Sequence, residues 1–380
     1  MYMSSTLRYS FRLRPGDAAL RRLNLEWGQS RWLWNEALKA KRLGYWVSDK
    51  DLTFWRNDPD TAWLAEGSVV AQQQTLRKFW TSKARKWKSK YRDLPSLQYT
   101  KRGFSLKPDK TTGVLRLHLP GRISVPVVWS RDLSSDPSSV TVYQDSLGHW
   151  YASFVVERED EQLPATNASI GIDWGVAEIA TTTSDPHDLP HPEYGKKART
   201  KLAKYQRMMA RRKPQPGQTA SKGYKQAKNK TARTHKKISR QRQDTARKWA
   251  RSVVRDFDQI AVEDFRPKFM AKNRGLARKA ADAAIGTTKR ELIDYATRAG
   301  RKVVPVPPAH TTMDCSGCGT RATARLDLSE RTYTCHACGL VMPRDKNSAR
   351  VILAAAGFHR ADAESVRPGK ASSRKKTLAA

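Results

Sequence analysis

The sequence predicts a multidomain α+β protein: a β module with an inserted helical segment, then an α/β section that carries a small metal-binding insertion. Hydrophobic and polar residues alternate near the N-terminus and again from about Leu97 to Glu157, as they do in half-buried strands. Between these two stretches the hydrophobic residues recur at helical spacing. After Ser169 short apolar runs alternate with helical patterns, and two Cys-x-x-Cys pairs follow.

The composition indicates a polyanionic partner. Of 380 residues, 72 are Lys or Arg and 36 are Asp or Glu, so the formal net charge is +36, which favours nucleic acid. An anionic membrane is the competing interpretation. However, Met1 to Ser10 lack the apolar core of a signal peptide, and no apolar run is long enough to span a bilayer. We therefore expect a cytoplasmic, nucleoid-associated protein with no membrane partner.

The first elements are expected to be a half-buried strand with a basic outer face and two helices. In the strand, Leu7, Tyr9, Phe11 and Leu13 alternate with Arg8, Ser10 and Arg12. The first helical pattern is marked by Leu20, Leu23, Trp27, Trp34 and Leu38. The second is marked by Val69, Leu76 and Trp80, which are expected on its buried side. Their aromatic residues are expected in the core, with base stacking as the alternative.

Strands return after these helices. Val140 and Val142 precede a turn at Asp145–Gly148, and the alternation that starts at Trp150 completes a hairpin. The polar segment Glu157–Pro164 is expected to be a linker. Beyond it we predict strands at 170–173, 179–183, 259–263 and 303–306, and a helix that ends at Gly300.

Two of these strands end in a carboxylate, Asp173 and Glu263, and a third acid, Asp345, begins an Ala-rich helix that ends near Gly357. A single acid at a strand end is most often a solvated turn residue. Three carboxylates delivered by separate elements are what a two-metal phosphodiesterase site needs. We therefore predict that these three acids bind two Mg²⁺ ions.

The residues around these acids fit the same interpretation. Gly171 and Gly175 flank Asp173 and allow the backbone and a substrate to approach closely. Asp264 is expected on the opposite face of its strand from Glu263, as a structural acid. Two further nearby acids are rejected as metal ligands: Asp185 and Asp188.

The four cysteines are predicted to form a zinc ribbon, with Cys315, Cys318, Cys335 and Cys338 as ligands. Two Cys-x-x-Cys knuckles separated by sixteen residues suit one tetrahedral ion. Two independent redox pairs are the alternative, which fits poorly because Gly319 and Gly339 supply the turn that a knuckle needs. Since four thiolates fill the shell, the site is expected to be structural, and His310 and His336 are not needed as ligands.

A basic insertion is expected to bind phosphates. From Lys196 to Ala250, Asp244 is the only acidic residue. A solvated helix pair is the alternative, but the intrahelical ion pairs that stabilise exposed helices are scarce here. Phosphate contact is the better interpretation, and four residues are assigned to it: Lys236, Lys237, Arg240 and Arg242.

The order of these motifs resembles that of the transposon-encoded TnpB proteins. The opening strand Tyr9–Pro15 and the segment Trp27–Leu38 resemble the start of that family. The family's three RuvC-type nuclease motifs and inserted zinc ribbon are matched by Gly171–Gly175, Val262–Asp264, the two cysteine pairs and Arg344–Asn347. The resemblance spans nearly the whole chain. Departures at Thr311–Asp314, Pro343 and Ser348 remove no metal ligand.

This resemblance implies a monomeric, magnesium-dependent, RNA-guided endonuclease that cuts both strands of double-stranded target DNA at one RuvC site beside a short flanking motif. It implies Asp173, Glu263 and Asp345 as the catalytic triad and the four cysteines as zinc ligands. The implied domains are a β-barrel wedge domain at 1–15 and 97–164, a helical recognition domain at 16–96, an RNase H-like (RuvC) nuclease domain at 165–309 and 341–358, a zinc ribbon at 310–340 and a basic disordered tail at 359–380.

Three neighbouring glutamines are candidates for reading the flanking motif: Gln72, Gln73 and Gln74. At least one of them should project from the polar side of its helix, and a glutamine can pair with the major-groove edge of adenine. Three solvated glutamines are an equally good interpretation.

Other functions remain possible at this stage. A miniature type V CRISPR effector would share the nuclease, and an adjacent repeat array would distinguish it. A non-cleaving, RNA-guided DNA-binding repressor would usually lack a triad acid, and all three stand here. A strand-transferring transposase would give strand-exchange products.

Overall fold

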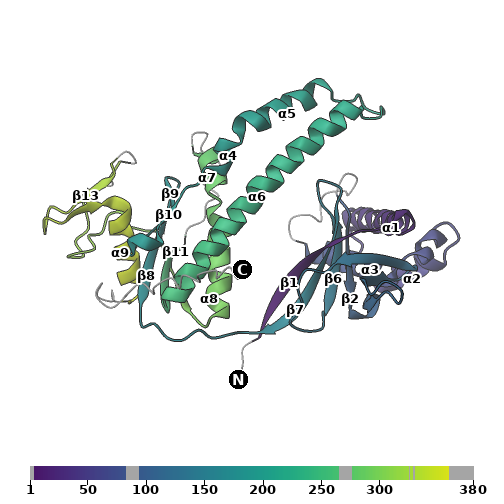
Figure 1. Ribbon diagram of the computed structural model, residues 1–380, viewed down its shortest axis with the longest axis horizontal. Coiled ribbons are helices and arrows are strands. Elements are labelled where there is room, and N and C mark those ends of the chain that lie inside the picture. The colour runs from purple at the N-terminus through teal and green to yellow at the C-terminus, as the bar shows by residue number, and fades with distance from the viewer. Residues whose placement is uncertain (1–3, 83–93, 265–275, 325, 328–329, 359–380) are drawn as a thin grey trace, which may run out of the picture. The chain divides into compact units, whose positions relative to one another are not determined.

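The structure is a computed structural model that describes residues 4–82, 94–264, 276–324, 326–327 and 330–358 (Figure 1). The chain divides into two compact units. Unit 1 comprises Met1–Glu159 with Lys228–Arg233, and unit 2 comprises Asp160–Ala227 and Thr234–Ala380. The basic tail expected at 359–380 lies outside the described residues.

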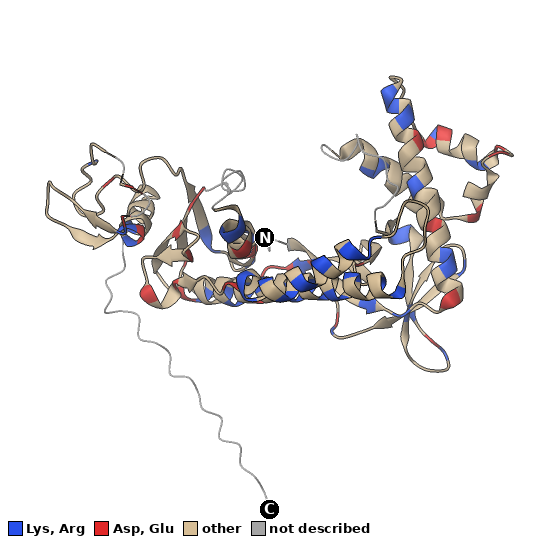
Figure 2. Cartoon of the chain, turned by 90° about the horizontal axis from the view of Figure 1, so that it is seen from above, with Lys and Arg blue, Asp and Glu red and all other residues tan. Residues whose placement is uncertain are grey.

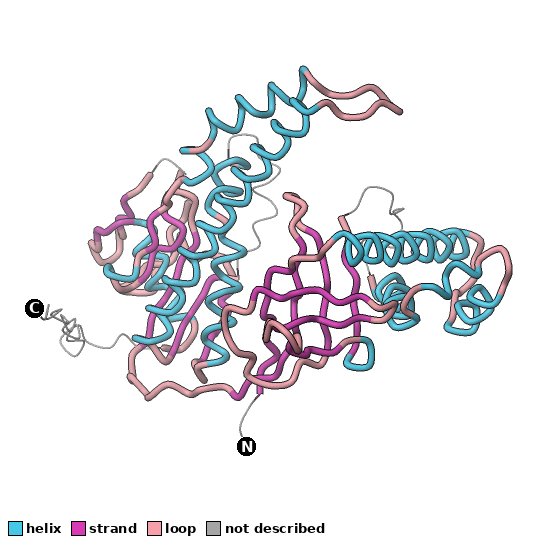
Figure 3. The backbone as a smooth tube through the Cα atoms, turned by 45° about the vertical axis from the view of Figure 1, so that its right-hand side comes forward, coloured by secondary structure: helices cyan, strands magenta, loops and turns pink. Residues whose placement is uncertain are grey.

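Unit 1 contains a seven-stranded sheet in the order β2-β6-β7-β1-β5-β4-β3 (Figure 3). Its strands are β1 (Ser4–Leu13), β2 (Ser96–Thr100), β3 (Ser105–Pro108), β4 (Leu115–Leu119), β5 (Ile123–Val128), β6 (Ser139–Gln144) and β7 (Trp150–Glu159). All pairings between these strands are antiparallel. Among the described residues the strands therefore form a sheet with β2 and β3 at its edges, and not the closed barrel that was expected.

The predicted alternation is confirmed in this sheet. Phe11 and Leu13 are buried and Arg8 and Arg12 are exposed, because successive strand residues face opposite sides. The predicted hairpin is β6 and β7, with Gln144 paired to Trp150 and a turn between them.

The helices of unit 1 are α1 (Asp17–Arg42), α2 (Asp49–Asn57) and α3 (Val69–Thr81), with a short 3-10 turn at Ala62–Glu66. Leu23 and Trp27 of α1 belong to the core of the sheet. Trp34 of α1 and Phe79 of α3 belong to a second core among the helices. The expectation that Val69 is buried is wrong: it is 41% exposed, because it is the first residue of α3 and precedes the packed turns.

Unit 2 contains a five-stranded sheet in the order β10-β9-β8-β11-β12. Its strands are β8 (Ser169–Trp174), β9 (Glu178–Thr182), β10 (Leu189–Pro190), β11 (Gln259–Glu263) and β12 (Lys302–Val306). β8, β11 and β12 are parallel to one another, whereas β9 is antiparallel to β8. The predicted strands of this section are confirmed.

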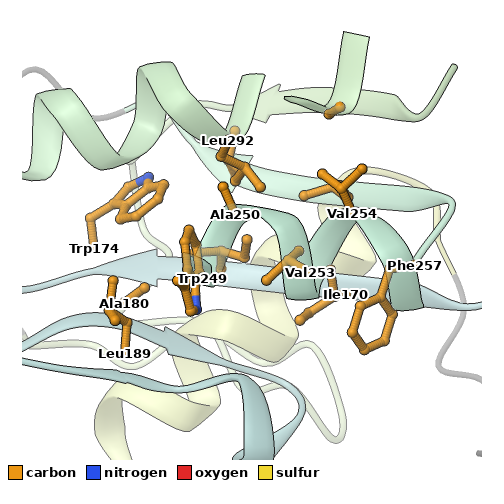
Figure 4. Close-up of a cluster of buried hydrophobic side chains, with 14 of the residues drawn as sticks. Ile170, Trp174, Ala180, Leu189, Trp249, Ala250, Val253, Val254, Phe257 and Leu292 are labelled. Carbon is orange, nitrogen blue, oxygen red and sulfur yellow. The ribbon is translucent and has the colours of Figure 1, made fainter. Parts of the chain in front are cut away.

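Helices α6 (Lys222–Asp256) and α8 (Ile285–Arg298) pack on one face of this sheet. Figure 4 shows Ile170 of β8 beside Val253 of α6, with Leu292 of α8 in the same cluster. Alternate residues of β8 supply this core, since Ile170, Ile172 and Trp174 are all buried in it.

Helix α9 (Arg344–Ala355) packs on the opposite face, where Ile352 and Leu353 contact Ala261 of β11. The short strands β13 (Thr332–Thr334) and β14 (Val341–Pro343) pair directly before α9. The expected helix after Asp345 is therefore confirmed, and Gly357 follows it with φ +72°.

The remaining helices of unit 2 are α4 (Tyr194–Lys197), α5 (Arg199–Arg211) and α7 (Ala277–Ala283). The basic insertion is thus a helical hairpin of α5 and α6 (Figure 1). As predicted, α8 ends next to a glycine: its last residue is Arg298, Ala299 is the C-cap, and Gly300 follows in the left-handed region at φ +69°. Among the described helices, none combines the length and the apolar character required to cross a bilayer.

Candidate functional site

Asp173 and Glu263 lie on one face of the sheet of unit 2. β8 and β11 are parallel neighbours, and Gly171 pairs in register with Ala261. Because strand residues alternate between faces, the acids two positions further along point to the same face as this pair. That face is the one covered by α9, since Ala261 contacts α9.

Asp345 comes to the same place from α9, where it is the acidic residue of the first helical turn. Its side chain is 34% exposed and has two arginine neighbours. Arg344 Nε lies 3.5 Å from its Oδ1, and Arg331 Nη1 lies 4.0 Å from its Oδ2. Its place at the helix N-terminus is one where negative charge interacts favourably with the helix dipole. The structure therefore brings the three predicted acids together.

The electrostatics show that these acids interact. Burial, with the nearby charges of Glu263 and Asp345, raises the pKa of Asp173 well above its usual range, although Arg344 and the backbone N–H of Trp174 act in the other direction. Burial raises the pKa of Glu263 to about 7, against the opposing effects of Lys289 and the same N–H. A cation bound between such carboxylates would stabilise their ionised forms.

The acids that the sequence interpretation rejected have structural partners instead. Lys289 Nζ donates to Asp264 Oδ1 at 3.0 Å. Lys346 Nζ lies 2.6 Å from Asp185 Oδ1 and 2.7 Å from Asp188 Oδ2. These ion pairs fix α8 and α9 beside the carboxylate site. Because both lysines are distant in sequence from the acids, periodicity alone could not reveal the pairs.

The four cysteine side chains converge and could bind a metal ion. Their sulfur atoms all lie within 4.8 Å of one another, with 3.6 Å between Cys315 and Cys338 and 3.7 Å between Cys318 and Cys335. Among the described residues, these four cysteines form the one group of three or more His, Cys, Asp or Glu side chains whose ligand atoms come this close together.

The two knuckles have matching backbones. Gly319 N–H donates to the Cys315 carbonyl and Gly339 N–H to the Cys335 carbonyl, each at 2.9 Å. Both glycines have φ near +75°, at +75° and +74°, so the predicted need for glycine is confirmed. Hydrogen bonding with Thr320 lowers the pKa of the Cys318 thiol, whereas hydrogen bonding with Cys318 and burial raise that of Cys338 against the backbone N–H of Leu340, so the thiols titrate as one interacting set.

The four basic residues predicted to contact phosphate differ in how exposed their side chains are. Lysines and arginines follow α6 along its length (Figure 2). Lys237 and Arg240 are exposed, and neither forms an ion pair with another described residue. Arg242, however, is only 26% exposed, and its Nη2 lies 2.6 Å from Asp282 Oδ1. This ion pair occupies part of the guanidinium, so Arg242 is less available to a phosphate than Lys237 or Arg240. Lys236 is half-buried and has a partner within the protein.

Gln72 is fully buried, so its proposed contact with a DNA base is wrong. Its Oε1 accepts from Arg56 Nη1 at 2.6 Å, and its Nε2 donates to the Leu64 carbonyl at 2.8 Å and to Gln29 Oε1 at 3.1 Å. The side chain thus holds the turn before α3. Gln73 and Gln74 are partly exposed.

Comparison with known proteins assigns the family. Two family models match: OrfB_IS605, described as a probable transposase, at residues 153–274, and the Cas12f1-like TNB domain at residues 286–352. A Streptomyces pristinaespiralis protein named as an RNA-guided DNA endonuclease is 31% identical over 388 residues, which cover 96% of this chain and 93% of the relative. The chain belongs to the TnpB family.

Two further similarities agree with membership of the TnpB family. InsQ of Escherichia coli (strain K12), also named as an RNA-guided DNA endonuclease, is 28% identical over 394 residues and 95% of each chain. A solved structure of a Cas12f1-sgRNA-target DNA complex superposes with a TM-score of 0.57, covering 92% of this chain and 98% of that one. At 11% identity this last similarity shows a shared fold.

Proposed function

We propose that the chain is an RNA-guided endonuclease that hydrolyses phosphodiester bonds of target DNA. The observation that carries this proposal is the meeting of Asp173, Glu263 and Asp345 on one face of the sheet of unit 2. Similarity to two relatives named for this activity, over at least 93% of the length of each, supports it.

The acidic site suits two Mg²⁺ ions. Carboxylate oxygens are the ligands that this ion prefers, and burial raises the pKa values of Asp173 and Glu263 despite the nearby Arg344 and Lys289, so bound cations would stabilise their ionised forms. Asp173 and Asp345 would be shared between the ions, and Glu263 would complete the second position. When bound, the ions would activate the attacking water and stabilise the leaving oxygen.

The neighbouring cations hold this site in place. Lys289 donates to the Glu263 carbonyl at 3.2 Å and pairs with Asp264, so it fixes the end of β11. Arg344 donates from Nη1 to the Asp327 carbonyl at 2.9 Å while its Nε faces Asp345. Both residues would orient carboxylates and would not touch the reacting atoms.

The cysteine set suits one structural Zn²⁺. Zinc–sulfur bonds of about 2.3 Å in a tetrahedron place the sulfur atoms about 3.8 Å apart. The closest pairs here are separated by 3.6 and 3.7 Å. Four thiolates close the site to substrate. Elemental analysis of purified protein should give one zinc per chain, and its absence from active protein would overturn this assignment.

The partners proposed are a guide RNA and double-stranded target DNA. A protein that leaves sequence recognition to base pairing has to hold a heteroduplex by its phosphates, and the net charge of +36 supports this. We assign unit 1 to the wedge and recognition domains and unit 2 to the RuvC domain with its zinc ribbon, acting as a cytoplasmic monomer.

The test begins with the RNA that copurifies with the full chain. Its 3′ segment should act as a guide, so that a plasmid with a matching sequence is cut in Mg²⁺ and a plasmid with a scrambled sequence is not. RNA-independent cutting would overturn the proposal. Binding without cutting by the intact triad would favour the repressor function, and a repeat array beside the gene would favour a CRISPR effector.

A further inference from the structure

The side chain of Asn347 joins helix α9 to the first cysteine knuckle. It is fully buried. Its Oδ1 accepts from the backbone N–H of Ser316 at 2.9 Å, and its Nδ2 donates to the backbone carbonyl of Asp314 at 2.8 Å. These two backbone groups stand on either side of Cys315. One amide therefore bonds the chain immediately before and after a metal ligand.

This contact constrains α9 closely. An amide offers its acceptor and donor in one plane, so both bonds form together only in one orientation of the side chain. Losing the knuckle would leave two buried polar groups unsatisfied. Asn347 is two residues after Asp345, in the first part of the same helix. Whatever fixes Asn347 therefore fixes the start of α9 and the carboxylate that it carries.

The residue before Asp345 is held by the same insertion. Arg344 N–H donates to the Arg331 carbonyl at 2.8 Å, and Arg344 Nη1 donates to the Asp327 carbonyl at 2.9 Å. β14 also runs directly into α9, because Pro343 is the last residue of the strand and Arg344 the first of the helix. The ribbon thus holds the chain on both sides of Asp345.

The far side of α9 is held by the strand that carries Asp173. The Ala349 carbonyl is in close contact with Gly171 of β8. Helix α9 is therefore fixed between the knuckle and the sheet. A shift of the knuckle has to be taken up by the first turn of α9, which contains Asp345.

We propose that Asn347 is a positioning residue that couples the cysteine site to the acidic site, so that zinc and the divalent ion at the triad bind cooperatively. This inference rests on the proposed function. Coupling between two sites is reciprocal, so each metal should raise the affinity of the protein for the other.

The test uses the full chain with its copurified RNA and measures binding instead of cleavage. Mn²⁺ serves as the probe of the acidic site, by electron paramagnetic resonance, and zinc affinity is measured by competition with a chromogenic chelator. The variants are Asn347→Ala, Cys318→Ser and their double. Tyr333→Phe is the matched control, because its hydroxyl donates at 3.2 Å to the Met313 carbonyl within the ribbon.

In the wild type, removing zinc should weaken Mn²⁺ binding at least about fivefold, the lower end of typical couplings. Cys318→Ser should also weaken Mn²⁺ binding, because it removes a zinc ligand and leaves the residues of α9 unchanged. Asn347→Ala should weaken Mn²⁺ binding with zinc present and make it insensitive to zinc removal, so that the double variant is no worse than Asn347→Ala. Tyr333→Phe should leave Mn²⁺ affinity unchanged at saturating zinc.

Two outcomes would overturn the coupling: Mn²⁺ affinity that does not respond to zinc in the wild type, or Asn347→Ala protein that binds Mn²⁺ normally. Circular dichroism establishes that each variant is folded before binding is measured. Failure of the acidic site itself has a different signature, because Asp173→Ala would then bind Mn²⁺ as tightly as the wild type.

Discussion

Gly171 and Ala349 lie in direct contact where β8 meets α9. A Cβ atom built on Gly171 would stand 2.1 Å from the backbone oxygen of Ala349, far inside van der Waals contact. Asp173 is two residues beyond this glycine, and Asp345 is one helical turn before Ala349. The spacing of the two carboxylates is therefore set by a contact in which neither partner is a carboxylate.

We predict that Gly171→Ala displaces α9 and impairs cleavage more than it impairs guide RNA binding. Because the obstructing atom belongs to the helix backbone, relief requires the helix to move, and the free energy of unfolding should fall by about 1–3 kcal/mol. Gly28→Ala is the control, since nothing lies within 4 Å of its added Cβ. Thermal unfolding and cleavage assays on both variants check this, and normal cleavage by Gly171→Ala would contradict it.

Replacing any triad acid by alanine should abolish cleavage and leave RNA-guided DNA binding largely intact. Each change removes a proposed metal ligand and no cation, so the loss should exceed the roughly 100-fold typical of an outer-shell partner. Without metal, Asp173→Ala should be at least as stable as the wild type, because it removes a carboxyl whose burial, together with repulsion from Glu263 and Asp345, raises its pKa. Asp264→Ala is the control. Full activity of a triad variant in Mg²⁺ would remove that residue from the site.

Neutralising Lys237 and Arg240 should weaken binding for every guide and flatten its salt dependence. Each phosphate contact contributes about 0.9 to the slope of log K against log salt on duplex DNA, so the double glutamine variant should lose about 1–2. Lys248→Gln is the matched control on the same helix, because Lys248 already lies 2.8 Å from Asp244. Equal slopes for the double variant and the wild type would show that these side chains face only solvent.

Replacing the two partly exposed glutamines of α3 should have a different effect from replacing the buried one. Gln73→Ala with Gln74→Ala should change the preferred base in a library of randomised flanks if either side chain reads DNA. Gln72→Ala should instead lower stability, by about 1–3 kcal/mol, because Arg56 and the Leu64 carbonyl lose a buried partner. An unaltered flank preference in the double variant would leave both residues as helix surface.

Glu26 should make unit 1 less stable as the pH rises. Burial raises the pKa of this carboxyl from 4.5 to about 7, although its Oε1 accepts the Ser68 N–H at 2.8 Å. Between these values the folded chain keeps a proton that the unfolded chain has lost, so the free energy of unfolding falls as pH rises. The full effect is about 3 kcal/mol.

Glu26→Gln keeps the acceptor and removes this titration. Hydrogen exchange at the start of α3, corrected for intrinsic rates, should slow in the variant relative to the wild type at pH 8 and match it near pH 4. Glu36→Gln on the same helix controls for the loss of a glutamate. A wild type and variant that differ equally at both pH values would refute the burial effect.

The elements of the chain were predictable because each one has a local signal. Alternation indicated β1 and β7, short apolar runs indicated β8 and β11, and the cysteine spacing indicated the four-cysteine cluster. That Asp173 and Glu263 point to the same face of the sheet also follows from the alternation of strand residues, once β8 and β11 are known to be neighbours. These features depend on periods of a few residues, which a single sequence displays directly.

The features that the sequence did not reveal depend on partners that are distant in the chain. Arg242 looks like a free cation until α7 places Asp282 beside it, 40 residues away, and Gln72 looks exposed until Arg56 and Leu64 close around it. Asn347 has no periodic signal because its partners are backbone atoms. Burial by tertiary contacts overrides the helical pattern at each of these positions.

Asp282 has a wider consequence for the basic hairpin. Its Oδ1 accepts from Gly195 N–H at 2.7 Å and from Arg242, and its Oδ2 accepts from Lys196 N–H at 2.9 Å, so one carboxylate ties the outgoing and returning arms together. Beyond that point the outgoing arm contributes nothing to the core, since α5 has no buried residue. The two arms of the hairpin are therefore tied at its root by a single carboxylate, and a change that removes it would release both arms at once.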